Sequence, residues 1–218
     1  MDFVIRRLTL ERPQRPIVLV GMSLGGNVLL KWLGEQGSLL PPQVRAATAV
    51  STPFDLARSC RHIDQTAGRF YSRRFLRSLR RKALEKIARY PSIADADAVR
   101  RAESLWEFDN AFTSVVHGFE NAADYYSRCS SLGFLNSICV PTLLLSAFDD
   151  PFHPPDVLHQ VAAIAETNPW LSTEFVDIGG HVGFIEGATP WRTSSYGERR
   201  PVEFADTCLS GLRLAGAD

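Results

Sequence analysis

The fold of this chain is decided by residues 17–25, which read IVLVGMSLG. The first four of them are apolar and mostly β-branched, which predicts a strand buried on both faces, as in a parallel sheet. The pattern G-x-S-x-G follows, with Ser23 between Gly21 and Gly25. Residues 28–33 then continue as an apolar helix. A strand, a sharp turn and a helix in this order predict that Ser23 is exposed at the C-terminal end of the strand.

A serine hydroxyl in such a turn needs two partners to act as a nucleophile. A base must take its proton, and a third group must orient that base. The glycines of the pattern are expected to relieve crowding in the turn. The backbone N–H of Leu24, at the start of the helix, is expected to donate to an oxyanion. Glycine-rich turns without catalytic roles carry the same pattern, so the acid and the base decide the interpretation.

The rest of the chain alternates between strands and helices, apart from one long insertion. Hydrophobic runs and periodicity predict strands at 44–50, 142–148 and 173–178, and helices at 2–10, 156–166 and 202–212. Residues 54–137 are rich in arginines and aromatic residues, and they are predicted to be helical throughout. We therefore expect an α/β fold with a parallel, doubly wound sheet in a single domain over 1–218. Its core would be 1–53 and 138–218, with 54–137 as a helical cap.

A base is expected after the last strand, because open α/β sheets place their sites at the carboxyl ends of strands. His181 follows strand 173–178 and is surrounded by glycines that allow a tight loop to aim its ring. The other histidines are less well placed, in the insertion, close to the acid or in mid-helix: His62, His117, His153 and His159.

The acid is expected after strand 142–148, which ends at Asp149 and Asp150. Pro151 favours an extended conformation at Asp150, which suits a loop that leaves a strand. We favour Asp150, although either carboxylate is also consistent with a turn or capping role.

Four short motifs occur in order along the chain: GMSLGGN at 21–27, DYY at 124–126, DDPF at 149–152 and GGHVGF at 179–184. With these motifs, residues 1–187 resemble the YheT-like hydrolases, the AB hydrolase 4 branch of the α/β-hydrolase superfamily. The resemblance implies Ser23 as nucleophile, Asp150 as acid and His181 as base. It also implies hydrolysis of carboxylic esters with lipid or fatty-acyl groups through an acyl-enzyme, without a cofactor. Alternatives are an acyltransferase that makes fatty-acid esters with the same triad, and an inactive remnant that only binds a partner.

Members of this family carry a long segment before the nucleophile turn, with the first strands of the sheet and a loop that donates a second oxyanion N–H. Here Ser23 lies near the start, so we expect an N-terminally truncated sheet in which residues 17–20 form an edge strand with exposed apolar faces. Only Leu24 would then supply an oxyanion donor, and the loss of one donor typically costs about 10²–10³ in kcat. A misplaced start codon or a truncated gene product would explain this.

The composition of the chain limits which classes of partner we expect. Lys plus Arg and Asp plus Glu both number 24, so overall charge gives no reason to expect a nucleic-acid partner. The spacing of the four cysteines matches no zinc site, and we expect reduced, mostly buried thiols and no metal. No apolar run approaches the roughly 18 residues of a membrane span. We expect a cytoplasmic protein with a small, lipid-like ester substrate and no obligate protein partner.

One segment departs from this balance. Residues 69–89 contain nine basic side chains, with Glu85 as the only acid. Apolar residues recur among them at helical spacing: Phe75, Leu76, Leu79 and Ile87. The segment is consistent with a cap helix that makes peripheral contact with anionic lipid. It is equally consistent with a solvated helix face over a core stripe.

Overall fold

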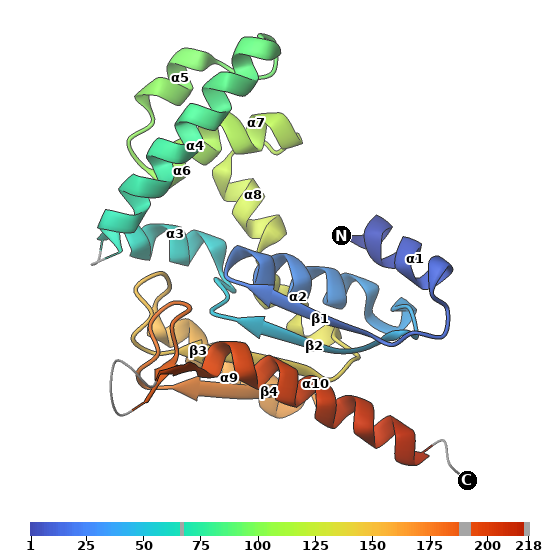
Figure 1. Cartoon of the computed structure of the whole chain (residues 1–218). Helices are drawn as coiled ribbons and strands as arrows, with labels where there is room; N and C mark the ends of the chain where they lie inside the picture. The colour runs from blue at the N-terminus through green and yellow to red at the C-terminus, as the bar shows by residue number, and fades with distance from the viewer. Residues whose placement is uncertain (66–67, 188–192, 216–218) are drawn as a thin grey trace. The chain divides into compact units, whose positions relative to one another are not determined.

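Figure 1 shows a computed structural model of the chain, which describes residues 1–65, 68–187 and 193–215. The chain forms two compact units. Unit 1 consists of Met1–Phe54, Ser131–Asp150 and Pro155–Asp218, and unit 2 consists of Asp55–Ser130 and Pro151–Pro154. Residues 131–137, expected in the insertion, thus belong to unit 1, and residues 151–154 belong to unit 2.

Unit 1 is built on a parallel four-stranded sheet in the order β1-β2-β3-β4 (Figure 1). The strands are β1 Ile17–Met22, β2 Val44–Val50, β3 Thr142–Ala147 and β4 Leu171–Val176. All four are the predicted strands, and their ends shift by at most two residues. The register pairs Met22 with Val50 and Val50 with Leu145, so the first three strands end side by side.

Helices cover both faces of this sheet, as a doubly wound fold requires. They are α1 Asp2–Glu11, α2 Leu24–Gln36, α9 Pro155–Thr167 and α10 Tyr196–Ala215, with short 3₁₀ turns η1 Gly37–Leu39 and η3 Ser131–Ser137. The main core joins Leu30 of α2 and Leu158 of α9 to Ala49 of β2 and Leu144 of β3. A second cluster on the opposite face contains Val50 and Leu145, and α10 contacts β2 and β3 there. A small antiparallel pair, β5 Ile185–Glu186 and β6 Ser194–Ser195, precedes α10.

Strand β1 lies at the edge of the described sheet. It pairs with β2 on one side, and none of the strands described pairs with its other side. Val20 is 54% and Met22 44% exposed, whereas every residue of β3 is buried. The prediction that this strand is buried on both faces is therefore wrong, and the prediction of an edge strand with exposed apolar residues is confirmed. An apolar edge of this kind is a surface on which another strand can pair.

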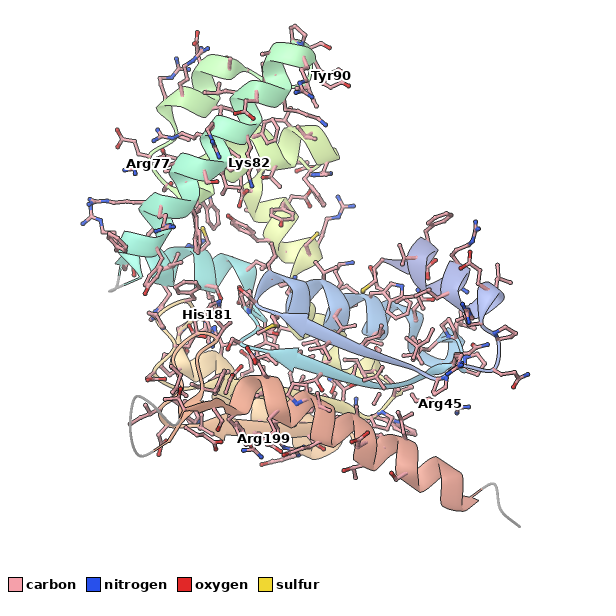
Figure 2. All side chains as sticks on the ribbon, viewed as in Figure 1. Arg45, Arg77, Lys82, Tyr90, His181 and Arg199 are labelled. Carbon is pink, nitrogen blue, oxygen red and sulfur yellow. The ribbon has the colours of Figure 1, made fainter. Side chains whose placement is uncertain are left out.

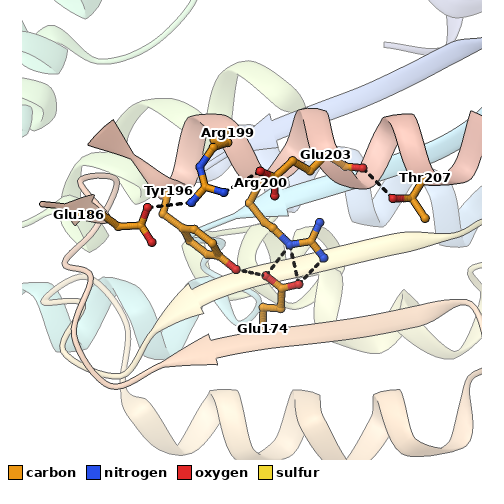
Figure 3. A network of polar contacts seen from close by, with 7 residues as sticks. All are labelled: Glu174, Glu186, Tyr196, Arg199, Arg200, Glu203 and Thr207. Atoms are coloured by element: carbon orange, nitrogen blue, oxygen red, sulfur yellow. Dashed lines mark hydrogen bonds and ion pairs between the residues drawn. The ribbon is translucent and has the colours of Figure 1, made fainter. Parts of the chain in front are cut away.

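The C-terminal helix is tied to β4 by polar contacts (Figure 3). Glu174 accepts hydrogen bonds from Arg200, at 2.5 to 3.0 Å, and from the Tyr196 hydroxyl at 2.7 Å. The bond to Glu174 raises the pKa of Tyr196. Both donors lie at the start of α10, which begins six residues before its predicted start at 202. Arg199 forms more exposed ion pairs with Glu186 and Glu203, which contribute little to stability.

Unit 2 is helical, as predicted for the insertion. It contains α3 Leu56–Gln65, α4 Arg69–Arg89, α5 Ala96–Arg101, α6 Leu105–Phe108, the π-helical turn η2 Asp109–Thr113, α7 Ser114–His117 and α8 Ala122–Cys129. Three short helices begin at side-chain caps that accept a backbone N–H: Asp95, Ser104 and Asn121. The core of the unit packs the buried stripe of α4 against α5 and α6 through Leu76, Ala83, Ile87, Val99 and Phe108.

None of the four cysteines forms a disulfide. Cys60 is buried, Cys129 and Cys208 are half-buried and Cys139 is exposed, so the expectation of mostly buried thiols is wrong. No helix within the described ranges is long and apolar enough to cross a membrane. Within the same ranges, no group of three or more His, Cys, Asp or Glu side chains could hold a metal ion.

Candidate active site

Ser23 occupies the turn between β1 and α2, as its motif predicted. It is the N-cap residue of α2 and has φ 52° and ψ −128°. A residue other than glycine at positive φ typically costs about 1–3 kcal/mol, and such strain is common at functional sites. The turn is held by the Ser23 N–H, which donates to the Val50 carbonyl oxygen at 2.8 Å, and by the Gly26 N–H, which donates to the Ser23 carbonyl oxygen at 2.9 Å.

The glycines of this turn do not all serve the same purpose. A Cβ on Gly21 would lie 2.6 Å from the Gly25 carbonyl oxygen, so that position needs glycine. A Cβ on Gly25 would meet nothing within 4 Å. The expectation that both glycines relieve crowding is therefore confirmed for Gly21 and wrong for Gly25. Gly26 is the second crowded position, because a Cβ there would lie 2.0 Å from Thr52 Oγ1.

The structure brings the three predicted residues together within unit 1. His181 Nε2 lies 2.9 Å from Ser23 Oγ, and His181 Nδ1 lies 2.8 Å from Asp150 Oδ2. Ser23 follows β1, Asp150 follows β3 and His181 follows β4, so all three meet at the carboxyl ends of the strands. Figure 2 shows His181 at the end of the sheet to which the strand arrowheads point.

The burial of the acid suits this chain of contacts. Asp150 is 2% exposed, and its carboxylate faces a ring nitrogen of His181. With Nδ1 donating to that carboxylate, Nε2 is free to accept the Ser23 hydroxyl proton. A carboxylate away from water also stabilises the imidazolium that forms when the proton moves. This order of contacts is the one that nucleophilic catalysis by a serine requires.

Asp149 and Asp150, of which the sequence favoured Asp150 as the acid, have different contacts. Asp149 is exposed, and its Oδ1 accepts the backbone N–H of Gly179 at 2.9 Å and of Gly180 at 2.8 Å. Asp149 thus holds the loop that carries His181, while Asp150 contacts the ring itself. Sequence reasoning missed this contact of Asp149. The sequence offered one signal for it: a second acid, Asp149, lies next to Asp150, and two adjacent glycines come just before His181.

The loop around His181 also depends on its glycines. Gly180 has φ 63°, a conformation that favours glycine. A Cβ on Gly179 would lie 2.7 Å from the ring of Phe184, whose N–H donates to the Gly179 carbonyl oxygen at 2.9 Å. The tight loop predicted from these glycines is confirmed. Among the other histidines, His159 packs its ring against that of Phe148, with the ring centroids 5.1 Å apart.

A candidate oxyanion donor lies beside the serine. Leu24 is the first residue of α2, and its backbone N–H belongs to the group that a helix leaves unpaired at its N-terminus. The first turn of α2 contains no acidic residue that would compete for these donors. The helix dipole adds partial positive charge at this end. The site can therefore stabilise negative charge that develops next to Ser23 Oγ.

Comparison with known families identifies the fold. Residues 4–188 match the family described as the alpha/beta hydrolase fold. The chain belongs to the alpha/beta hydrolase fold family. The expected fold is thereby confirmed, with a parallel four-stranded sheet and helices around it.

Relatives of this alpha/beta hydrolase include named esterases and lipases. It is 38% identical over 191 residues to the Escherichia coli K12 protein named "Putative esterase YheT", covering 85% of this chain and 54% of that protein. It is 30% identical over 210 residues to human "Phospholipase ABHD3", covering 96% of this chain and 50% of that protein. The predicted resemblance to YheT-like hydrolases is confirmed. The chain spans about half the length of these two relatives.

A solved structure shares the fold. The esterase Pf2001 of Pyrococcus furiosus superposes with a TM-score of 0.51 at 18% identity, covering 94% of this chain and 60% of that one. At this identity the likeness concerns the fold alone.

Proposed function

We propose that the chain is a serine hydrolase that cleaves carboxylic esters of fatty-acyl or other lipid-like groups. The observation that carries the proposal is the continuous hydrogen-bonded chain from Ser23 through His181 to the buried Asp150. The names of its relatives as esterase and phospholipase support ester substrates with acyl chains. The alpha/beta hydrolase fold hosts many reactions, so the reaction class is argued from the site.

The first half of the proposed reaction forms an acyl-enzyme. Ser23 Oγ attacks the ester carbonyl carbon while His181 Nε2 takes the hydroxyl proton. The carbonyl oxygen becomes an oxyanion, to which the Leu24 N–H donates. When the tetrahedral intermediate collapses, the C–O bond to the alcohol breaks, and His181 returns the proton to the departing oxygen. Asp150 keeps the imidazole in the tautomer that this transfer needs.

The second half releases the acid. Water gives a proton to His181 Nε2 and attacks the acyl carbon, and the proton then returns to Ser23 Oγ as the ester bond to the enzyme breaks. If an alcohol replaces water in this step, the product is a new ester. Hydrolysis and acyl transfer therefore use the same residues and differ only in the acceptor.

The test is hydrolysis of p-nitrophenyl acyl esters of increasing chain length by the purified 218-residue chain. Wild type should release p-nitrophenol, and Ser23→Ala should reduce kcat by about 10⁴ or more. The exposed Ser38 lies outside this site, and Ser38→Ala serves as the matched control. A Ser23→Ala variant that folds and keeps wild-type activity would reject the proposal. Product analysis in water–ethanol mixtures then measures how the acyl group divides between acid and ethyl ester.

A further inference from the structure

Helix α4 carries far more positive charge than the rest of the chain. Basic and acidic residues both number 24 overall, yet the 21 residues of α4 contain nine basic side chains and one acidic one. The basic residues are Arg69, Arg73, Arg74, Arg77, Arg80, Arg81, Lys82, Lys86 and Arg89. More than a third of the chain's cations thus lie on a single helix of unit 2.

These cations surround the exposed part of the helix. The buried side of α4 is a narrow stripe of Ser72, Leu76, Ala83 and Ile87. At about 100° per residue, Arg77 and Lys82 project about 140° apart around the helix axis; both are labelled in Figure 2. The core stripe expected from the sequence is therefore present, although Phe75 and Leu79 are exposed at 40% and 37%. A core requirement does not explain nine charges on the remaining surface.

Close ion pairs to the cations of α4 are absent from the described residues. In the part of the chain that the structure describes, none of its nine cations has a carboxylate oxygen within 4 Å. Arg80 donates to the backbone oxygens of Arg100 and Ala102, at 3.2 and 3.3 Å. Lys86 lies 5.4 Å from the ring of Tyr90. These contacts are to neutral groups and do not remove the positive charge of either side chain.

Part of this charge lines a cleft within unit 2. Arg69, Arg73, Arg77 and Arg80 border a volume of about 520 Å³, to which Asp64 and Glu103 also contribute. Asp64 already accepts the hydroxyl of Ser72. Four guanidinium groups against two carboxylates give the cleft a positive excess. Guanidinium groups bind phosphate oxygens through two parallel N–H donors, which suits a phosphate-bearing ligand.

Exposed aromatic side chains lie among the basic residues in the first half of α4. Phe70 is 71% exposed and Tyr71 45%. Their rings pack edge to face at 5.9 Å, and Tyr71 and Phe75 both pack against Phe152, at 5.2 and 5.8 Å. Aromatic side chains are favoured at the boundary between lipid headgroups and acyl chains. Basic residues interleaved with exposed aromatic ones are typical of helices that lie on a membrane surface.

We propose that α4 is a docking surface for anionic phospholipid bilayers. The cleft arginines and the outer cations bind headgroup phosphates, and Phe70 and Tyr71 enter the interface. The choice of lipid over another polyanion rests on the proposed function, because an enzyme for lipid-like esters finds its substrate at such a surface. Bilayer binding itself needs no catalysis, so the two proposals fail separately.

The experiment measures vesicle co-sedimentation of the 218-residue chain with Ser23→Ala, which removes the proposed hydrolysis. Vesicles are phosphatidylcholine alone, or phosphatidylcholine mixed with phosphatidylserine. Binding is expected only with the mixture, and it should weaken as salt rises, since about 0.1 M salt screens charge beyond about 10 Å. Arg74→Gln with Arg81→Gln should weaken binding about 25-fold, or about fivefold for each charge.

Matched variants separate local from global charge effects. Arg12→Gln with Arg15→Gln removes two charges from unit 1 that are also exposed, and it should change binding less than twofold. Arg74→Lys with Arg81→Lys keeps the charge and should keep the binding. Phe70→Ala should weaken binding several-fold.

Three results would overturn the proposal. The first is equal binding to both vesicles or to neither, and the second is equal weakening by the two charge-neutralising pairs. The third is that the chain binds a single-stranded oligonucleotide but no vesicles, and that neutralising Arg74 and Arg81 weakens this binding. That result would assign the surface to nucleic acid. If vesicles bind as expected and ester hydrolysis is absent, only the proposed function falls.

Discussion

Asp149→Ala should weaken the site without destroying it, because Asp149 holds the loop of His181 rather than its ring. The substitution removes two hydrogen bonds, from the N–H groups of Gly179 and Gly180. Asp149 is exposed, so we assign about 1 kcal/mol to each bond. The loss of about 2 kcal/mol lowers the population of the ordered loop by up to about 30-fold. We expect kcat/KM for a p-nitrophenyl ester to fall by that factor at most.

Asp150 provides the contrast. Asp150→Asn places an amide against His181 Nδ1 and favours the wrong ring tautomer, which in a Ser-His-Asp site costs about 10⁴ in kcat. Asp149→Asn should behave differently, because its amide oxygen still accepts from Gly179 and Gly180. The assay is the pair of kcat/KM ratios, measured after circular dichroism has shown each variant to be folded. The reasoning is refuted if Asp149→Asn is as inactive as Asp149→Ala, or if Asp150→Asn retains more activity than Asp149→Ala.

Gly26→Ala should lower the free energy of unfolding by about 1–3 kcal/mol, because its Cβ would meet Thr52 Oγ1 at 2.0 Å; Gly25→Ala, which meets nothing within 4 Å, should not lower it in urea melts. Burial raises the pKa of Asp109 above its ordinary value of 3.8. At a pH between the pKa of Asp109 in the unfolded chain and its higher pKa in the folded chain, the folded chain binds more protons, so the free energy of unfolding falls as pH rises through this range. Asp109→Asn should remove this slope from stability measured against pH, and an unchanged slope would contradict the assignment. Burial also raises the pKa of Cys60 to about 11, so a maleimide at neutral pH should modify the exposed Cys139 first, as peptide mapping can check. Glu174→Gln should lower the melting temperature more than Glu186→Gln, because Glu174 is the less exposed acid and accepts from two side chains.

The fold was predictable from sequence where local signals and burial agree. The strand over 142–147 has an apolar centre, is buried throughout, and its predicted end lay within one residue of the observed one. Residues 17–20 are more apolar still, but their burial depends on a neighbouring strand, and among the described strands β1 has a partner on one side only. The hydrophobic pattern of a segment indicates whether it forms a strand, whereas the number of neighbouring strands depends on how the whole sheet is assembled.

The candidate site was predictable because its residues follow strands. Ser23, Asp150 and His181 each come directly after a predicted strand, and parallel strands bring their carboxyl ends to the same edge. The contacts of Asp149 were not predictable, since they depend on where the loop N–H groups of another segment point. The crowding at Gly26 was missed for the same reason: the atom it approaches belongs to Thr52 on a different loop.

The central claim is that Ser23 is an activated nucleophile, and reaction with a fluorophosphonate probe tests it most directly. The probe phosphonylates serine only where a base has removed the hydroxyl proton, so it reports activation without a known substrate. Intact-mass and peptide analysis should find one adduct, on Ser23, which is absent from Ser23→Ala and strongly slowed in His181→Ala. A folded wild-type chain that gains no adduct, or gains it on another residue at the same rate in Ser23→Ala, would contradict the account.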